Sequence, residues 1–555
     1  MKRVYTLGIL GLFFIGMAIF AEKLGLDNDI GWGRKRIFIA QIGAVMLLAA
    51  LLLMAFRKQL DKLTSNLSKL KEKFSQLKPA TRANIFTFIT AVLVIDIFYW
   101  YVLPCFNNPK LTFDYYAKQA IAFRNGQLHL LDKPAPELLA LSDPYNDNLR
   151  RISNVHDLYL IDASLYKEKY YLYWGPAPSL FLTVFNTDQI AKIKDKYVSF
   201  IFSCGLFLYL TLIIRNIWSK FNRTLPIWFL SFFLLTLGLS MPLTALMKNP
   251  RIYEAAVLGG QFFYIGGLYW VYTSLRDKGQ NQTRLLLGGV HWAIALAIRL
   301  TTWPAIMFCA FATVLYILKD WKMLSFKKVL LSSSLIWIPL LLSVAGLGWY
   351  NWARFDSVFE FGLRYQLANA DYSKFTAPFS TVFIKGNLYN YFLYPFIIQA
   401  KFPYFVPVEN IFSNERMTGI IYTSVFLFFI FIPIFRILYT GNFRKDDPKK
   451  PPEVFLIFVL STSLLIMLFV ILSFYYPTVR YSLDFLTLFF VTTFFVMSNE
   501  YNLIENIRIR YIFLFTFTIM GVWSIVLCSL LSLPNQHIAN ILHLAKQIYR
   551  WLSFG

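Results

Sequence analysis

The feature that most constrains this chain is the recurrence of apolar runs, because a run of about 20 residues crosses the hydrocarbon core of a bilayer as a helix. Only 15% of the 555 residues are charged and 57% are hydrophobic, which excludes a soluble multidomain enzyme and a disordered chain. We therefore predict an all-α polytopic membrane protein with thirteen transmembrane helices. Their expected ranges are 5–21, 36–56, 84–104, 196–215, 225–246, 255–275, 284–299, 302–319, 329–349, 419–438, 454–474, 483–497 and 511–531.

The runs divide the chain into four parts. Run 5–21 lacks a small-residue cleavage site, so we interpret it as a retained helix rather than a signal peptide. It forms a two-helix N-terminal appendage, 1–56, with the next run. The basic segment 57–83 has leucines at near-helical spacing and is expected to lie along the cytoplasmic membrane surface. The transmembrane core spans 84–531, and an outer C-terminal tail, 532–555, follows it.

The distribution of Lys and Arg predicts the orientation. With the N-terminus inside, the cytoplasmic segments hold 27 of these residues and the short outer segments hold 10. This places the C-terminus and two long loops, 105–195 and 350–418, outside. Cytoplasmic loops also account for the net charge of +24, so no nucleic-acid partner is expected. The three Asn-x-Ser/Thr triplets lie in the cytoplasmic segments, which fits the cytoplasmic (inner) membrane of a bacterium.

The first long loop opens on a helix with an acidic residue at its start. Residues 113–121 place apolar side chains on one helical face, and Gly126 ends the pattern. We expect this helix to lie at the membrane interface, with Asp114 at its N-terminus. An Asp there caps the helix by accepting from free backbone N–H groups. A capped, ionised Asp114 is also available as a catalytic base, so both interpretations stand together.

Aromatic residues dominate the rest of that loop. Segment 142–147 has the composition of a turn, and two aromatic runs flank Lys167-Glu168, which predicts a β-hairpin. The aromatic side chains either stack on a sugar or form an interfacial belt of Tyr and Trp; the sequence favours neither. The candidate substrate-binding residues of this loop are Asp162, Lys169, Tyr170 and Trp174.

Isolated charges stand beside apolar runs in the shorter outer loops. Arginine and carboxylate at such depth are costly and usually face a cavity or a partner. A structural Arg–Glu pair explains any one of them, but several on one face favour a site. The candidates are Arg251, Tyr253, Glu254, Arg299, Arg480 and Tyr481.

Other polar residues predict no chemistry. Asp96 and His291, inside apolar runs, are expected to make helix–helix hydrogen bonds. Four scattered cysteines are too few for a disulfide framework or a zinc site, and we expect at least three of them to be small core residues. His129, His156 and His537 show no metal-ligand spacing, and no nucleotide-binding or metalloprotease motif occurs.

The order of these features resembles the GT-C superfamily of membrane glycosyltransferases, which includes protein O-mannosyltransferases and lipid A aminoarabinose transferases. The resemblance covers the eleven predicted helices from about residue 84 onward. Two departures are clear: Asp114 is followed by Tyr115 where relatives often carry a second acid, and Glu254 stands where a second Asp is usual. The two N-terminal helices have no clear counterpart. The supporting segments are 113–120 followed by 125–128, then 171–178, 251–254 and 480–481, with 350–355 and 360–365, including Arg364, shared by a bacterial subgroup.

The resemblance implies a transferase that moves a sugar from a polyprenyl phosphate to an acceptor hydroxyl on the outer side of the membrane. The acceptor is a glycolipid, a polysaccharide or a protein. Asp114 would take the acceptor proton in a one-step inverting displacement. Arg299 and Arg480 would stabilise the leaving lipid phosphate, and Glu254 would orient the acceptor or hold Asp114. Some members of the superfamily need a divalent metal, but no dense acidic cluster supports one here, so we expect no cofactor.

Two other classes remain open. A lipid or polysaccharide transporter would need a continuous polar path and commonly shows repeat symmetry, and neither is visible in the sequence. A non-catalytic scaffold of an envelope assembly complex explains the aromatic loops but not the isolated arginines.

Overall fold

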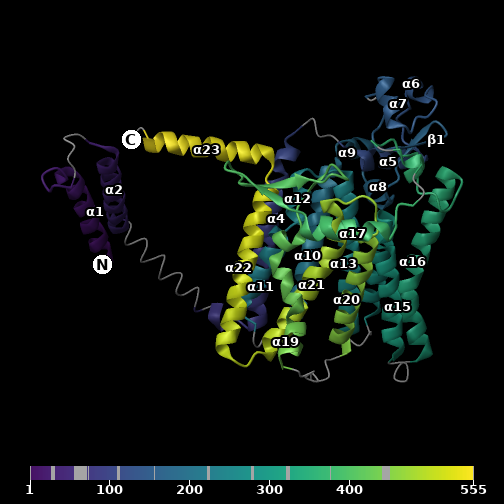
Figure 1. Ribbon diagram of the computed structural model, residues 1–555. Helices are drawn as coiled ribbons and strands as arrows, with labels where there is room; N and C mark the ends of the chain where they lie inside the picture. Colours follow the sequence, from purple (N-terminus) through teal and green to yellow (C-terminus); the bar gives the residue numbers. More distant parts are fainter. Residues whose placement is uncertain are drawn as a thin grey trace. The chain divides into compact units, whose positions relative to one another are not determined.

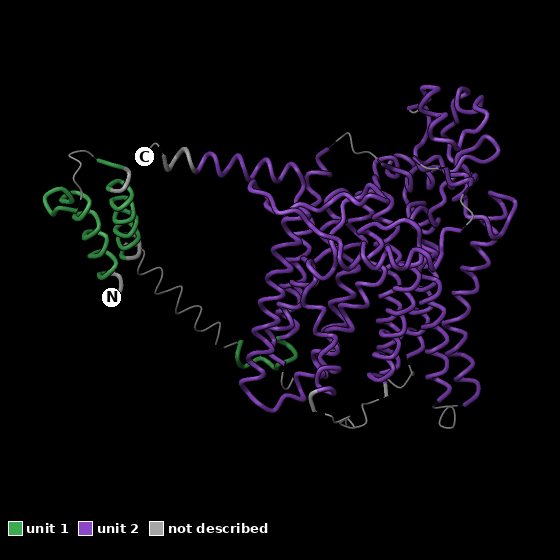
Figure 2. The backbone as a smooth tube through the Cα atoms, viewed as in Figure 1, with its two compact units in different colours: residues 1–82 green, residues 83–555 purple. Residues whose placement is uncertain are grey.

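The computed structural model describes residues 2–26, 32–55, 72, 74–108, 113–155, 157–221, 225–276, 281–319, 325–369, 371–374, 377–440 and 451–553. The chain forms two compact units, residues 1–82 and residues 83–555 (Figure 2). Most of the predicted basic surface segment, 57–71 and 73, lies outside the described residues.

The first unit is built on a helical hairpin. Helices α1 (Lys2–Phe20) and α2 (Arg34–Ala55) pack along each other. Gly11 and Gly43 bring the two backbones together, because a Cβ on either one would lie within 2.8 Å of the other's carbonyl oxygen. Small residues at helix contacts are typical of association within lipid. This packed pair of helices lies within residues 1–56, where the sequence analysis predicted a two-helix appendage.

The second unit is a bundle of long apolar helices that lie side by side (Figure 1). Helix α13 packs on α10 and α14, α14 packs on α16, and α21 packs on α20 and α10. Helix α21 is the most enclosed of the long apolar helices, and it carries Arg480 and Asp484. The bundle helices are α4 (Pro79–Phe106), α10 (Asp195–Phe221), α11 (Ile227–Leu239), α13 (Ile252–Arg276), α14 (Gln282–Ile298), α15 (Trp303–Lys319), α16 (Phe326–Phe355), α20 (Pro451–Leu472), α21 (Val479–Leu503) and α22 (Ile507–Leu531).

Seven helices in the described part of the chain are long and apolar enough to cross a membrane. They are Pro79–Phe106, Asp195–Lys220, Leu300–Lys319, Phe326–Phe355, Pro452–Leu472, Val479–Leu503 and Ile507–Leu531. The predicted class, a helical multi-pass membrane protein, is supported by these helices. The predicted number of thirteen is not confirmed, and several of the remaining apolar helices are shorter, among them Ile227–Leu239 and Val425–Leu438.

Two predicted transmembrane helices are interrupted. Run 225–246 forms α11 and then α12 (Leu243–Lys248), because Ser240 is extended and Pro242 has no N–H with which to continue a helix. Run 419–438 consists of a short helix α18 (Ile420–Thr423), a 3₁₀ segment η6 (Val425–Phe431) and α19 (Ile432–Thr440). Hydropathy alone predicted each as one helix, and both predictions were wrong.

The first long loop folds into short helices around a hairpin. Strands β1 (Ser164–Tyr166) and β2 (Lys169–Tyr171) pair antiparallel, which confirms the predicted β-hairpin. Lys167 and Glu168 both have positive φ, as a two-residue type I′ turn requires. The helices of this loop are α5 (Tyr115–Arg124), α6 (Pro136–Leu139), α7 (Asp147–Ile152), α8 (Ala177–Leu182) and α9 (Thr187–Ala191).

The second long loop contains a small sheet that the sequence did not predict. Strands β3 (Phe396–Ile398), β4 (Phe405–Glu409) and β5 (Arg416–Met417) pair antiparallel in that order. Helix α17 (Val382–Leu388) and the short helical turns η3 (Leu363–Tyr365), η4 (Tyr372–Lys374) and η5 (Tyr389–Leu393) precede the sheet. The two long loops meet, since Asp162 N–H donates to Leu367 O at 2.8 Å and Leu367 N–H donates to Ala163 O at 2.9 Å. The chain's last helix is α23 (Asn535–Ser553).

Candidate functional site

Three of the predicted arginines lie at one end of the bundle, which we call the loop end because the two long loops connect there. Arg251 directly precedes α13, Arg480 lies in the first turn of α21, and Arg299 follows the last residue of α14. Neighbouring helices that run in opposite directions bring such termini to a common level. The loop end is therefore where side chains distant in sequence can form a site.

Tyr253 stands at the centre of this end. The guanidinium carbons of Arg251 and Arg480 lie 5.1 and 5.0 Å from the centroid of its ring, within the range of cation–π attraction. Its hydroxyl donates to a carboxylate oxygen of Asp162, and the Trp174 ring packs edge-on with centroids 5.4 Å apart. The structure thus brings together five of the predicted site residues from four separate segments.

Carboxylates only partly satisfy the two arginines. Arg480 Nη1 lies 2.7 Å from an oxygen of Glu415 and 3.8 Å from Glu254 Oε1. The other oxygen of Glu254 accepts from the backbone N–H of Arg251 at 2.9 Å and lies 3.8 Å from Arg251 Nε. Within the described residues, the buried Nε–H groups of Arg251 and Arg480 have no hydrogen-bond partner. Because buried donors are nearly always paired, these two are suited to an oxygen-rich anion.

Asp162 is an unusual carboxyl group in this cluster, which we call the arginine cluster (Asp162, Arg251, Tyr253, Glu254, Glu415 and Arg480). Burial raises its pKa from 3.8 to about 6, while a hydrogen bond from Gln366 at 2.8 Å and the charges of three arginines oppose that shift. Its backbone is left-handed, with φ of 62°. A carboxyl group that titrates close to neutrality, beside arginines, can take or give a proton.

Tyrosines from both long loops and from α21 surround the arginine cluster. Tyr173 packs on Trp174 with ring centroids 4.1 Å apart, and Tyr475 packs on Tyr372 at 6.1 Å. Tyr481 lies under the guanidinium of Arg480, 5.4 Å away. These rings give the loop end an aromatic lining beside its charges. The sequence analysis missed Glu415, Gln366 and Tyr372, because none lies in a motif or beside an apolar run. It included Tyr173 in segment 171–178 but did not select it as a site residue.

Arg299 is engaged in a structural pair. Its Nε and Nη2 donate to Asp484 Oδ2 at 3.1 and 2.6 Å, and Gln261 donates to the other oxygen at 3.1 Å. The Asp484 side chain is fully buried. The guanidinium carbon of Arg299 also lies 4.9 Å from the centroid of the Tyr481 ring. Tyr481 in turn contacts the guanidinium of Arg480, so Arg299 is linked to the arginine cluster through that ring. The predicted structural pairing describes Arg299 better than direct contact with a ligand.

Asp114 does not cap helix α5 as predicted. Its backbone occupies the N-cap position, but its side chain makes no capping hydrogen bond and pairs instead with Lys194 at 2.8 Å. Asp195, at the start of α10, accepts from the N–H groups of Tyr115 and Tyr116 at 3.0 and 3.2 Å. The carboxylate of Asp114 is therefore left partly exposed. Among the described residues it makes no hydrogen bond or ion pair with the arginine cluster.

Three predicted substrate-binding residues lie apart from the cluster. Tyr170 is a core residue of the hairpin, only 1% exposed. Lys169 is exposed on the same strand. Arg364 pairs with Glu360 at 2.7 Å and is largely exposed. The alternation of side chains along strand β2 explains why its neighbours Lys169 and Tyr170 point to opposite faces.

The two polar residues inside the bundle behave differently. His291 lies 2.8 Å from the Tyr209 hydroxyl and 2.8 Å from Leu287 O, which confirms the predicted hydrogen bonding. Asp96 is exposed on α4 and has no hydrogen-bond partner within the described part of the chain. The prediction for Asp96 was wrong, because its position on the helix turns it away from the neighbouring helices.

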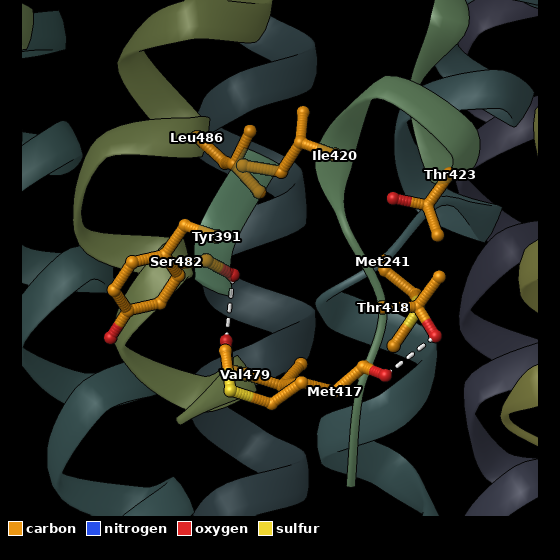
Figure 3. Close-up of a pocket in the computed structure, with 9 residues that line it drawn as sticks. All are labelled: Met241, Tyr391, Met417, Thr418, Ile420, Thr423, Val479, Ser482 and Leu486. Atoms are coloured by element: carbon orange, nitrogen blue, oxygen red, sulfur yellow. Dashed lines mark hydrogen bonds between the residues drawn. The ribbon is translucent and has the colours of Figure 1, made fainter. Parts of the chain in front are cut away.

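A small cavity lies beside the first turn of α21, lined by Met241, Tyr391, Met417, Thr418, Ile420, Thr423, Val479, Ser482 and Leu486 (Figure 3). Val479, Ser482 and Leu486 share one face of the helix, whereas Arg480 and Asp484 share another. The polar groups drawn there bond within the chain, Ser482 to Val479 O and Thr418 to Met417 O. This cavity is separate from the arginine cluster and presents no charged group.

Comparisons of the chain with protein-family models, with curated proteins and with solved structures found no match. The fold and the site together define a helical multi-pass membrane protein with an arginine–carboxylate cluster at its loop end. Among the described residues, no three His, Cys, Asp or Glu side chains are grouped so as to hold a metal ion.

Proposed function

We propose that this chain is a membrane glycosyltransferase that transfers a sugar from a polyprenyl phosphate to an acceptor hydroxyl at the loop end of the bundle. The observation that carries the proposal is that the Nε–H groups of Arg251 and Arg480, beside Tyr253, have no hydrogen-bond partner among the described residues. Guanidinium groups match phosphate oxygens with paired donors. A phosphate attached to a lipid tail reaches a protein at the ends of its apolar helices, where these donors lie.

The reaction would be a single displacement. The bond between the anomeric carbon and the donor phosphate breaks as the acceptor oxygen bonds to that carbon from the opposite side. A carboxylate takes the acceptor proton. The leaving lipid phosphate gains negative charge, and Arg251 and Arg480 would stabilise it in a site poor in water. The anomeric configuration would invert, and the chemistry requires no additional cofactor.

Two carboxylates compete for the role of base. Asp114 is accessible and is held in place by Lys194. Asp162 lies in the arginine cluster with a pKa raised to about 6 by burial. We propose Asp114 as the base, because Asp162 already accepts hydrogen bonds from Tyr253 and Gln366. Glu254 would then position Arg251 and Arg480.

The remaining assignments belong to the same proposal. The membrane would be the cytoplasmic (inner) membrane of a bacterium, with the N-terminus inside and the long loops outside. The partners would be a polyprenyl-phosphate-linked sugar, membrane lipid, and an acceptor that is a glycolipid, a polysaccharide or a protein. The aromatic lining would stack on the sugar.

The test is a mass-spectrometric comparison of envelope glycolipids and glycans from cells that express the wild-type chain or single variants. Asp114→Asn and Arg480→Gln should each reduce the product at least about a hundredfold, since a base and a charge-stabilising donor each contribute about that much. The matched control is Asp132→Asn, because Asp132 also lies in the first long loop and pairs with a lysine, Lys118, at 2.5 Å. That variant should retain full product.

Each alternative has its own signature. Full product from Asp114→Asn, with product lost in Asp162→Asn, would move the base to Asp162. Full product from Arg480→Gln would exclude the arginine cluster as the phosphate site. A transporter would move a lipid-linked sugar across the membrane without a new glycosidic bond. A scaffold would lose the product on deletion of the gene but not in Asp114→Asn or Asp162→Asn.

A further inference from the structure

The C-terminal helix α23 has two contrasting faces. Apolar side chains recur on one side, at positions 538, 541, 542, 544, 545 and 548, whereas Ala539, His543 and Lys546 lie on the other. The helix contains no acidic residue. From residue 541 to residue 548 every side chain is exposed, including Ile541 at 37%, Leu544 at 56% and Ile548 at 49%. From residue 541 to residue 548, no described residue covers this apolar face.

The first turn of α23 fixes the direction in which that face points. The ring of His537 stacks on Trp100 of α4, with centroids 3.9 Å apart and planes 3° from parallel, and its Nε2 lies 2.7 Å from Trp100 O. Residues 537, 541, 544 and 548 are spaced by four, three and four, so they share one helical face. The exposed Ile541, Leu544 and Ile548 therefore continue the face that rests on α4.

The helices next to α23 indicate the level in the bilayer at which it lies. It begins four residues after α22 ends, and α22 is long and apolar enough to cross a membrane. Trp100 lies six residues before the end of α4, another such helix, at the level where tryptophan gathers in membrane proteins. Figure 1 shows that α23 points away from the bundle and does not continue along α22. A helix with these faces, at this level and in this direction, has the properties of an interfacial helix.

We propose that α23 lies in the lipid interface at the loop end of the bundle, with Ile541, Leu544 and Ile548 in the acyl region. Its occupant is the bilayer itself, since the apolar face continues from the surface of a membrane-crossing helix and the polar face carries cationic Lys546 without a carboxylate. The proposal is independent of any catalytic activity.

Spin labels on the full-length chain in phosphatidylcholine–phosphatidylglycerol vesicles test it. Nitroxide is attached at Ile541→Cys and Ile548→Cys on the apolar face, and at Ala539→Cys and His543→Cys on the polar face. The wild-type chain, whose cysteines are buried or half-buried, is labelled in parallel to give the background. Collisions with oxygen, which concentrates in acyl chains, are compared with collisions with a water-soluble nickel chelate.

The expected result is oxygen access at 541 and 548 that is several times greater than nickel access, with the opposite ratio at 539 and 543. Equal nickel access at all four positions would place α23 in water and overturn the proposal. Low access to both reagents at 541 and 548, with strongly immobilised labels, would mean that protein covers the face, and it too would overturn the proposal. Each variant must elute as one size-exclusion peak with the wild-type volume.

Discussion

Removal of Arg299 should destabilise the chain far more than removal of both members of its pair. In Arg299→Gln, the fully buried Asp484 carboxylate loses two charge-assisted hydrogen bonds, of 3.1 and 2.6 Å, and keeps the one from Gln261. Hydrogen bonds to charged groups contribute about 1.5–3 kcal/mol each. The expected loss in the free energy of unfolding is therefore about 3–5 kcal/mol, the cost of leaving a buried charge without its partner.

The double variant Arg299→Gln/Asp484→Asn replaces the ion pair by two neutral amides. It should recover most of that loss, because no uncompensated charge remains in the bundle. Reversible unfolding in mixed dodecyl sulfate micelles gives the free energies of the wild type, the two single variants and the double variant. A loss below about 1 kcal/mol in Arg299→Gln, or a double variant as unstable as the sum of the single ones, would refute the reasoning.

Three further predictions concern the loop end, each measured as a free energy of unfolding in the same micelles. Asp195→Ala should cost about 1–2 kcal/mol, because two N–H groups of α5 lose their acceptor. Asp114→Ala should cost less than about 1 kcal/mol, because it removes only a partly exposed ion pair. Equal losses would contradict the assignment of Asp195 as the cap of α5. Gly175→Ala should destabilise by about 1–3 kcal/mol, because the added Cβ would clash with the carbonyl oxygen of Ala297. An unchanged free energy of unfolding would mean that the backbone around Gly175 can move away from Ala297 at no cost. The stability contributed by protonated Asp162 should be complete below pH 3.8 and lost as pH rises through about 6, because burial raises the pKa of the folded carboxyl. Asp162→Asn should remove this decline in the free energy of unfolding with rising pH. If the variant keeps the same dependence on pH as the wild type, the prediction is refuted.

Local patterns in the sequence predicted the parts of the fold that depend on local physics. Apolar run length located the long helices, and the aromatic runs around Lys167-Glu168 predicted the hairpin of β1 and β2. The two interrupted runs were mispredicted, because hydropathy does not register that Pro242 lacks a donor or that η6 is a 3₁₀ segment.

The candidate site was predictable only in part. Charged residues beside apolar runs led the sequence analysis to Arg251, Tyr253, Glu254 and Arg480, and the structure brings these four residues together. The identity of each partner depended on tertiary packing. Asp195 replaced Asp114 as the cap of α5 from 81 positions away, and Glu415 contacts Arg480 from the loop between two strands of an unpredicted sheet. No spacing rule connects residues so distant in sequence.

The ion pair between Arg480 and Glu415 has a consequence for recognition. Glu415 ends the loop 410–415, whose tip holds the exposed residues Ile411 and Phe412, and that loop is closed by a hydrogen bond from Asn410 N–H to Glu415 O at 2.8 Å. Any anion that approaches Arg480 must compete with a carboxylate already in place. On the proposed function, a lipid-linked phosphate that displaced Glu415 from Arg480 would also move this apolar loop, so that binding of the phosphate and movement of the loop would occur together.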